Sequence, residues 1–282
     1  MKVAVTGSTG QLGRIIIEKL QSVMPAENIV ALARSVDKAR DLNVEVREFD
    51  YNKTEGLEKS LEDIDRLLLV SGNEFGKRAE QHQRVIEAAK NAGVKLLVYT
   101  SLLRTDNTSI VIADEHEITE KALISSGVPY VILRNGWYTE NYTVSIADIL
   151  SLGTLYGSAD DGKISSASRA DYAEAAAKVI SSGGHEGKIY ELAGDEYFTL
   201  SDFAEELSKQ SAQQIPYVNL PEEEYRNALL GAGLPTDLAG FLASSHVSTS
   251  KGDLFDEGKQ LSSLIGRPTT NLRQSIADAL KG

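Results

Sequence analysis

The chain has 282 residues and no cysteine among them. Without thiols it can form no disulfide bond, thiolate nucleophile or cysteine-based metal site, which is typical of proteins in the reducing cytosol. No run of about 18 apolar residues occurs either, so we expect no transmembrane segment. An apolar strand begins already at Val3, which leaves no room for a signal peptide, and we therefore expect a cytoplasmic protein.

Positive charge is scarce as well. The formal net charge is −12 at pH 7, and no block of basic residues offers a local exception. Such a protein would repel the phosphate backbone of a nucleic acid. We therefore expect no binding to nucleic acid, and the composition is that of an acidic soluble enzyme.

Several familiar catalytic motifs are missing. The sequence has no G-x-S-x-G, P-loop or H-E-x-x-H motif, which leaves hydrolase and nucleoside triphosphatase functions without support. The four histidines are scattered and predict no metal site. None of the 11 tyrosines has a lysine four residues later, so the Tyr-x-x-x-Lys acid/base pair of typical short-chain dehydrogenases is also absent.

What the sequence does contain, almost at its start, is three glycines spaced G-x-x-G-x-x-G. They follow the apolar residues Val3–Val5 and open an apolar helical pattern. A strand–turn–helix of this kind directs backbone N–H groups and a helix N-terminus at one point, which suits a pyrophosphate. The alternative is a glycine-rich turn that only packs the helix on the strand. The predicted phosphate loop comprises Gly7, Ser8, Thr9, Gly10, Gln11, Leu12 and Gly13.

The next predicted strand, 28–33, is followed by Arg34, with Lys38 and Arg40 close behind. In a dinucleotide-binding fold this position, about 20 residues beyond the last glycine, meets the adenosine ribose. Basic side chains there match a 2′-phosphate, which favours NADP(H) over NAD(H). The alternative is a solvated basic turn at the start of a helix. The negative charge of Asp37 in the same turn makes a phosphate site there less favourable.

Strands and helices alternate through the first half of the chain. This alternation predicts an α/β fold, a Rossmann-type doubly wound parallel sheet in the order 3-2-1-4-5-6, with ligands at the carboxyl ends of the strands. The strands are expected at 3–5, 28–33, 44–50, 66–70, 95–99 and 130–134, and the helices between them include 54–61, 78–91 and 114–126. The strand ends add Asp50 and Tyr51 beside the adenine, and Ser71, Gly72, Asn73, Thr100 and Ser101 nearer the middle of the cofactor.

The alternation weakens after about residue 145. We predict an NAD(P)-binding domain at 1–145 and a smaller α+β substrate-binding lobe at 146–282, part of which can return to the sheet. Within the lobe we expect a loop at 153–162, a helix at 169–181, strands at 189–192 and 215–220, a helix capped at Thr199, further helices to about 243, and a last helix at 271–280.

Several stretches together resemble the NmrA-like atypical short-chain dehydrogenase/reductase family, and most of all its bacterial NADPH quinone oxidoreductases of type 2 and triphenylmethane reductases. They are 6–13, Arg34, 99–101, 113–116 with 120–121, 133–138, 161–164, 168–172 and 264–268, so the resemblance covers nearly the whole chain. It implies NADP(H) as the cofactor, a two-domain fold, and reduction of quinones or similar flat acceptors. The sequence does not determine the oligomeric state, and a homodimer is possible.

The expected nicotinamide end lies after the sixth strand. Asn135 and Gly136 could meet the carboxamide or ribose, while Trp137 and Tyr138 could wall a planar substrate or simply pack in the core. Phe75 is a further substrate candidate. By the family resemblance, Arg169 contacts a cofactor phosphate, with a solvated residue before a helix as its alternative.

Two residues remain as weak catalytic candidates. Lys121 either binds a nicotinamide ribose hydroxyl or pairs with a neighbouring acid, and His116 either donates a proton or is structural. The missing Tyr-x-x-x-Lys pair agrees with a quinone substrate, because hydride addition to a quinone gives a stabilised oxyanion that water can protonate. The competing function is an NADP(H) sensor that regulates a partner without turnover, which would not need the Trp137–Tyr138 wall.

Overall fold

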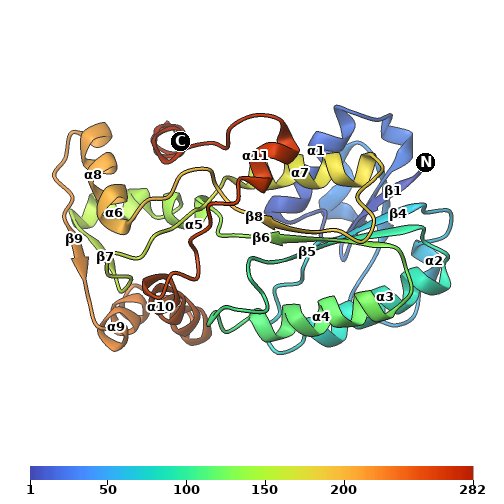
Figure 1. Ribbon diagram of the computed structural model, residues 1–282, viewed down its shortest axis with the longest axis horizontal. Coiled ribbons are helices and arrows are strands. Elements are labelled where there is room, and N and C mark those ends of the chain that lie inside the picture. The colour runs from blue at the N-terminus through green and yellow to red at the C-terminus, as the bar shows by residue number, and fades with distance from the viewer. Residues whose placement is uncertain (282) are drawn as a thin grey trace.

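The computed structural model describes residues 1–281 and is built on one seven-stranded parallel sheet (Figure 1). The order β3-β2-β1-β4-β5-β6-β8 confirms the predicted Rossmann-type arrangement and extends it by one strand. The strands are β1 (Val3–Val5), β2 (Ile29–Ala33), β3 (Glu45–Glu48), β4 (Arg66–Leu69), β5 (Leu96–Leu102), β6 (Tyr130–Asn135) and β8 (Ile189–Leu192).

Helices cover both faces of this sheet because its strands are apolar on both sides. Along β1, Val3 and Val5 belong to the core on one face and Ala4 to the core on the other. The first face packs against α1 (Gln11–Gln21) and α7 (Arg169–Ser181), and the second against α3 (Arg78–Asn91) and α4 (Ala113–Ser125).

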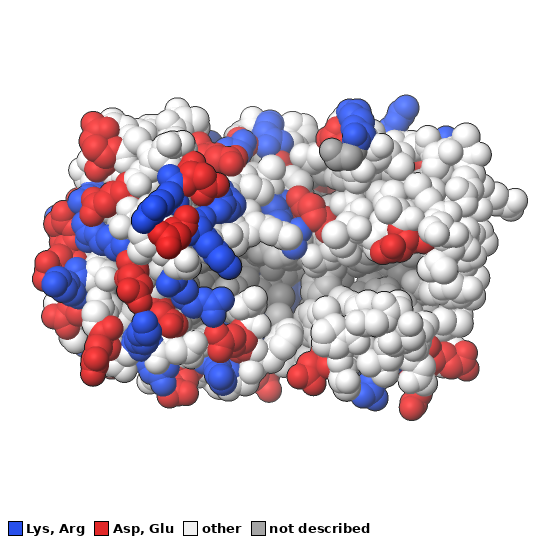
Figure 2. All heavy atoms as spheres, turned by 180° about the vertical axis from the view of Figure 1, so that it is seen from behind, with Lys and Arg blue, Asp and Glu red and all other residues white. Residues whose placement is uncertain are grey.

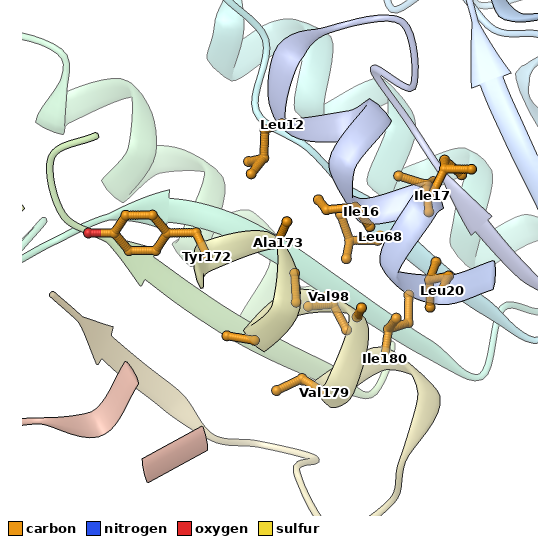
Figure 3. Packing of buried hydrophobic residues seen from close by; sticks show 14 of the residues in the cluster. Leu12, Ile16, Ile17, Leu20, Leu68, Val98, Tyr172, Ala173, Val179 and Ile180 are labelled. Atoms are coloured by element: carbon orange, nitrogen blue, oxygen red, sulfur yellow. The ribbon is translucent and has the colours of Figure 1, made fainter. Parts of the chain in front are cut away.

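The contact between α1 and α7 is dense (Figure 3). Ile16 and Leu20 of α1, one turn apart, are fully buried, and alanines such as Ala173 let α7 approach closely. Burial of each large side chain contributes about 1.5–3 kcal/mol relative to exposure. The interface therefore fixes the direction of α1, whose N-terminus carries the glycine loop.

The smaller part of the chain has its own core around Trp137 and Phe203. A two-stranded parallel sheet pairs β7 (Leu155–Gly157) with β9 (Tyr217–Asn219). The Thr199 capping box is confirmed, since Thr199 and Asp202 exchange side-chain-to-backbone hydrogen bonds. The remaining helices are η1 (Ala26–Asn28), η2 (Val36–Leu42), α2 (Leu57–Ser60), α5 (Glu140–Thr143), α6 (Ile146–Leu152), α8 (Leu200–Ser211), α9 (Glu222–Gly231), α10 (Thr236–Ser250), α11 (Gln260–Ile265) and α12 (Leu272–Ala279).

Some expected elements differ from the structure. The loop expected at 153–162 contains β7, which is only three residues long and depends on pairing with a strand about 60 positions away in sequence. The helix expected at 54–61 shrinks to α2. The division of the chain at residue 145 stays a prediction, and of its second part α7 and β8 lie with the sheet. Among residues 1–281, no helix has the length and apolar character that a membrane crossing requires.

Gly13 allows α1 to lie against the turn after β1, so we expect Gly13→Ala to destabilise the protein. A Cβ there would lie 2.3 Å from the Gly7 carbonyl oxygen and 2.9 Å from Ser8 Cα, both of them backbone atoms. Overpacking of this kind costs about 1–3 kcal/mol, measurable by urea unfolding. Gly240→Ala in α10, where a Cβ meets nothing within 4 Å, is the control and should not destabilise. Equal unfolding midpoints for the two variants would contradict this account.

Candidate functional site

A cavity of about 630 Å³ opens at the carboxyl ends of the sheet strands. In the view from behind, the molecule is hollowed between its two parts, and charged side chains gather over the half that carries the sheet (Figure 2). The structure places most of the predicted site residues on the cavity wall. These are Gly7, Thr9, Gly10, Gln11, Leu12, Gly13, Arg34, Asp50, Tyr51, Ser71, Gly72, Asn73, Phe75, Ser101, His116, Asn135, Gly136, Trp137, Tyr138 and Arg169.

The glycine loop forms one end of the cavity. Gly7 has a positive φ of 58°, which glycine adopts without strain, and Gly10 is the extended N-cap of α1. The first turn of α1 has neither a side-chain cap nor an acidic residue. Its N–H groups and the positive end of the helix dipole therefore suit an anion in the cavity.

Ser8 does not line the cavity, although it belongs to the predicted loop. Its side chain is buried and its hydroxyl donates to the Leu32 carbonyl at 3.0 Å, which ties the loop to β2. Thr100 lies behind the cavity wall in the same way, and its hydroxyl accepts the Ser71 N–H at 2.9 Å. Both residues therefore hold backbone segments that line the cavity, Ser8 at Leu32 and Thr100 at Ser71.

Of the predicted basic pair at the end of β2, only Arg34 lines the cavity. Lys38 lies on η2, outside the wall, and its carbonyl accepts a hydrogen bond from Arg14. Arg40 pairs with Asp37 of the same turn at 2.8 Å. Lys38 therefore does not line the cavity, and its contact with the ribose phosphate stays a prediction.

Sequence reasoning missed Glu74, which forms an ion pair with Arg34 at 3.4 Å and lines the same cavity. Glu74 also accepts a hydrogen bond from Asn52. A carboxylate beside Arg34 competes with any phosphate for the guanidinium. The sequence carried no signal of this, because Glu74 lies in a loop 40 residues beyond Arg34.

The middle of the cavity is a loop held from behind by α3. The Gly72 N–H donates to Nε2 of His82 at 2.9 Å, and the Gly72 carbonyl accepts from Nε of Arg78 at 2.7 Å. Arg78 in turn pairs with Glu115 of α4 at 2.9 Å and is almost fully buried. Gly72 is thus held at both its N–H and its carbonyl by side chains of α3, one of which is paired with α4.

At the far end, Asn135 presents an amide oxygen with no partner. Its Oδ1 is the one buried side-chain nitrogen or oxygen atom in residues 1–281 that lacks a hydrogen bond. Leaving such an atom unpaired costs about 1–3 kcal/mol, so a ligand with an N–H group would relieve it. A nicotinamide carboxamide carries such a group, and the orphaned atom therefore fits this cofactor.

Aromatic rings border the cavity beside Asn135. The ring centroid of Phe241 lies 6.1 Å from that of Trp137 and 5.3 Å from that of Phe75. Phe75 comes from the loop after β4 and is 47% exposed, whereas Phe241 comes from α10 in the smaller part of the chain. Three rings from separate segments thus make an apolar border suited to a planar molecule.

Tyr138 and Arg169 close the side of the cavity nearest α7. The Arg169 guanidinium lies 4.5 Å from the centre of the Tyr138 ring, and it also pairs with Glu140 at 3.4 Å. Its side chain is only 15% exposed. The alternative of a solvated residue before a helix therefore does not describe Arg169, whereas a contact with the cofactor stays a prediction.

Lys121 does not line the cavity, and the structure shows the second of its two expected roles, a pair with a neighbouring acid. Its ammonium pairs with Glu117 of the same helix at 2.7 Å, and its side chain is 68% exposed. The helix turns this position to solvent because His116 and Glu120 occupy the inner face of α4. Glu120 pairs with Arg134 at 2.8 Å and accepts the Ser101 hydroxyl.

The chain matches a family described as NAD(P)H-binding over residues 7–182. It is 52% identical to "Quinone oxidoreductase 2" of Escherichia coli over 98% of this chain and 97% of that protein. A solved structure of NADPH-dependent quinone oxidoreductase complexed with NADPH, also from E. coli, superposes with a TM-score of 0.96 at 52% identity and 99% coverage of both chains. The triphenylmethane reductase of Citrobacter superposes with a TM-score of 0.95 at 35% identity and full coverage of both chains. The resemblance drawn from the sequence is confirmed.

Because Glu74 competes for Arg34, we expect Glu74→Gln to tighten the binding of NADPH while leaving that of NADH nearly unchanged. Removing a negative charge a few ångströms from a phosphate near the surface gains about 1 kcal/mol, or roughly fivefold in affinity. Titration of tryptophan fluorescence with each nucleotide measures the change. Glu80→Gln, which removes the partner of Arg84 away from the cavity, is the control and should alter neither affinity. Equal tightening for NADH would refute the assignment of Arg34 to a 2′-phosphate.

Proposed function

The chain belongs to the NAD(P)H-binding family, and on that basis we propose that it is an NADPH-dependent reductase that passes a hydride to quinones or similar flat acceptors. The observation that carries the proposal is a dinucleotide-sized cavity whose far end combines an unpaired amide oxygen with an aromatic border. The near full-length similarity to a quinone oxidoreductase supports the same activity.

We assign the cofactor along the cavity by its chemistry. The pyrophosphate would lie on the N-terminus of α1, where Gly10 leaves the backbone open, and the 2′-phosphate would contact Arg34. Asn135 would accept a hydrogen bond from the carboxamide. The bound cofactor supplies the hydride, and the residues of this chain orient it and shield it from water.

The acceptor would lie against Trp137 and Phe241, with Phe75 at the entrance. A flat ring gains contact with the aromatic border, and positioning beside the nicotinamide would supply most of the rate. No Tyr-x-x-x-Lys acid is needed, because the anion of a hydroquinone is stable enough to take its proton from water. A cytoplasmic location, a homodimer and the lack of nucleic-acid binding stay predictions.

Arg34→Ala should weaken NADPH much more than NADH. A charge-assisted contact with a phosphate contributes roughly 1.5–3 kcal/mol, which corresponds to a loss of about 10- to 100-fold in affinity. Arg40→Ala removes an equal charge from the same turn but from a side chain paired with Asp37, so it should change the preference little. If the unmodified protein binds NADH as tightly as NADPH, the assignment of Arg34 has no basis.

The activity itself is tested by following NADPH absorbance with and without a small benzoquinone. We expect consumption of NADPH only when the quinone is present, and a Michaelis constant raised about three- to tenfold in Phe241→Ala, since an aromatic contact is worth about 0.5–1.5 kcal/mol. Leu238→Ala, one turn away on α10 and outside the cavity wall, is the control. Tight binding of NADPH with no consumption across a panel of quinones would favour the sensor function instead.

A further inference from the structure

A tyrosine and a histidine form a buried pair behind the aromatic end of the cavity. The Tyr99 hydroxyl lies 2.7 Å from Nδ1 of His116, and Tyr99 is fully buried in β5. His116, in the second turn of α4, lines the cavity together with Asn135 and Trp137. The pair therefore connects the centre of the sheet to the place where the acceptor is expected.

We propose that His116 acts as a neutral hydrogen-bond donor to the oxygen of the acceptor, and that Tyr99 is the positioning residue that fixes the imidazole for this role. The proposal rests on the proposed reduction of quinones. From the sequence, His116 is only a weak candidate for proton donation. The proposal gives it a different role, that of an electrophilic group that keeps its proton.

The hydrogen bonds of the neighbours set the tautomer of His116. Within residues 1–281, the short hydrogen bond of the Tyr99 hydroxyl, at 2.7 Å, joins it to Nδ1 of His116, and the Thr119 hydroxyl also lies close to it. Thr119, the other hydroxyl beside Tyr99, already donates to the Glu115 carbonyl at 2.8 Å. Tyr99 therefore donates its proton to Nδ1, which places the single ring proton of the neutral His116 on Nε2 and makes this N–H the donor.

The hydrogen bonds of the adjacent His82 support this direction of donation. His82 receives the Gly72 N–H at Nε2, so its proton is on Nδ1 and donates to Thr119 at 3.1 Å. The hydroxyl of Thr119 is thus engaged both as donor and as acceptor. Both nitrogens of His82 and Nδ1 of His116 are thus engaged by hydrogen bonds within the protein, each of defined direction.

Burial, and after it a nearby positive charge, keeps the imidazoles of His116 and His82 neutral. Burial and the nearby Arg78 guanidinium hold the pKa of His116 well below its usual value, and they lower the pKa of His82 to about 3. The charged and titratable groups that face His116 are Tyr99 from β5, Arg78 and His82 from α3, and Glu115 from its own helix, which is paired with Arg78. A neutral imidazole can donate a hydrogen bond without transferring its proton.

The reaction then balances without an acid from the protein. The hydride carries two electrons from the reduced cofactor to the quinone, so the cofactor is oxidised, the quinone is reduced, and one oxygen becomes an oxyanion. The Nε2–H of His116 donates to that oxygen as its charge develops and keeps its proton. A proton from water then completes the hydroquinone.

The tautomer is tested directly by nitrogen NMR of protein labelled in its histidines. The His116 signals are assigned by their disappearance in His116→Gln. We expect a neutral ring protonated at Nε2 between pH 8 and pH 5, and in Tyr99→Phe a mixture of the two neutral tautomers. A ring protonated at Nδ1, or an imidazolium at pH 7, would overturn the proposal.

The donor role is tested without turnover by the binding of 4-nitrophenolate, a stand-in for the hydroquinone anion, in the presence of NADP⁺. We expect roughly tenfold weaker binding in His116→Ala, partial loss in Tyr99→Phe, and partial recovery in His116→Gln, which restores an N–H donor. The matched control is the Tyr190–His185 pair, with the same 2.7 Å contact between hydroxyl and Nδ1 but outside the cavity wall. Tyr190→Phe and His185→Gln should leave binding unchanged, and equal binding by His116→Ala would overturn the proposal.

Single-turnover reduction of benzoquinone separates this proposal from the proposed function. At saturating NADPH, His116→Ala should slow hydride transfer roughly 10- to 100-fold, the loss expected of one hydrogen bond to a charged oxygen. A loss beyond a thousandfold that depends on pH would identify a proton donor and contradict a neutral role. If the unmodified protein reduces no quinone, the proposed function fails, while the NMR result still decides the tautomer.

Discussion

The close approach of Gly13 to the carbonyl of Gly7 is the contact on which the rest of the site depends. Because no side chain intervenes, α1 begins directly against the turn after β1, and its uncapped N-terminus faces the centre of the strand ends. The interface between α1 and α7, which contains fully buried residues such as Ile16, fixes the direction of α1. The anion-binding end of the cavity is therefore a product of backbone geometry and core packing, with little contribution from side-chain charge.

The middle and the far end of the cavity are built differently, from polar groups that are buried and paired. Arg78 joins the loop after β4 to α4 through Glu115, and Arg134 joins β6 to α4 through Glu120. Breaking one partner of such a buried pair is costly, because the remaining charge is left uncompensated. These two bridges hold α4 at a fixed rotation, and that rotation decides which of its side chains meet the cavity.

The parts of this protein that were predictable are those encoded by neighbouring residues. The spacing of Gly7, Gly10 and Gly13, and the position of Arg34 after β2, follow from local sequence and appear on the cavity wall. The rotation of α4 was not predictable, because a buried charge at Glu120 breaks the apolar pattern, and so the sequence left both roles of Lys121 open. Phe241 and Glu74 were missed because their places in the cavity depend on segments far away in sequence.

The central claim is that the protein supports hydride transfer to a flat acceptor by positioning and hydrogen bonding, with no proton moving in the same step. The most direct measurement is the single-turnover oxidation of NADPH by benzoquinone, carried out with NADPH deuterated at the transferred position and, separately, in deuterated water. The account predicts that deuteration of the cofactor slows the step, whereas deuterated water leaves its rate unchanged. A solvent isotope effect on that same step, of a size comparable to that of the cofactor, would contradict it.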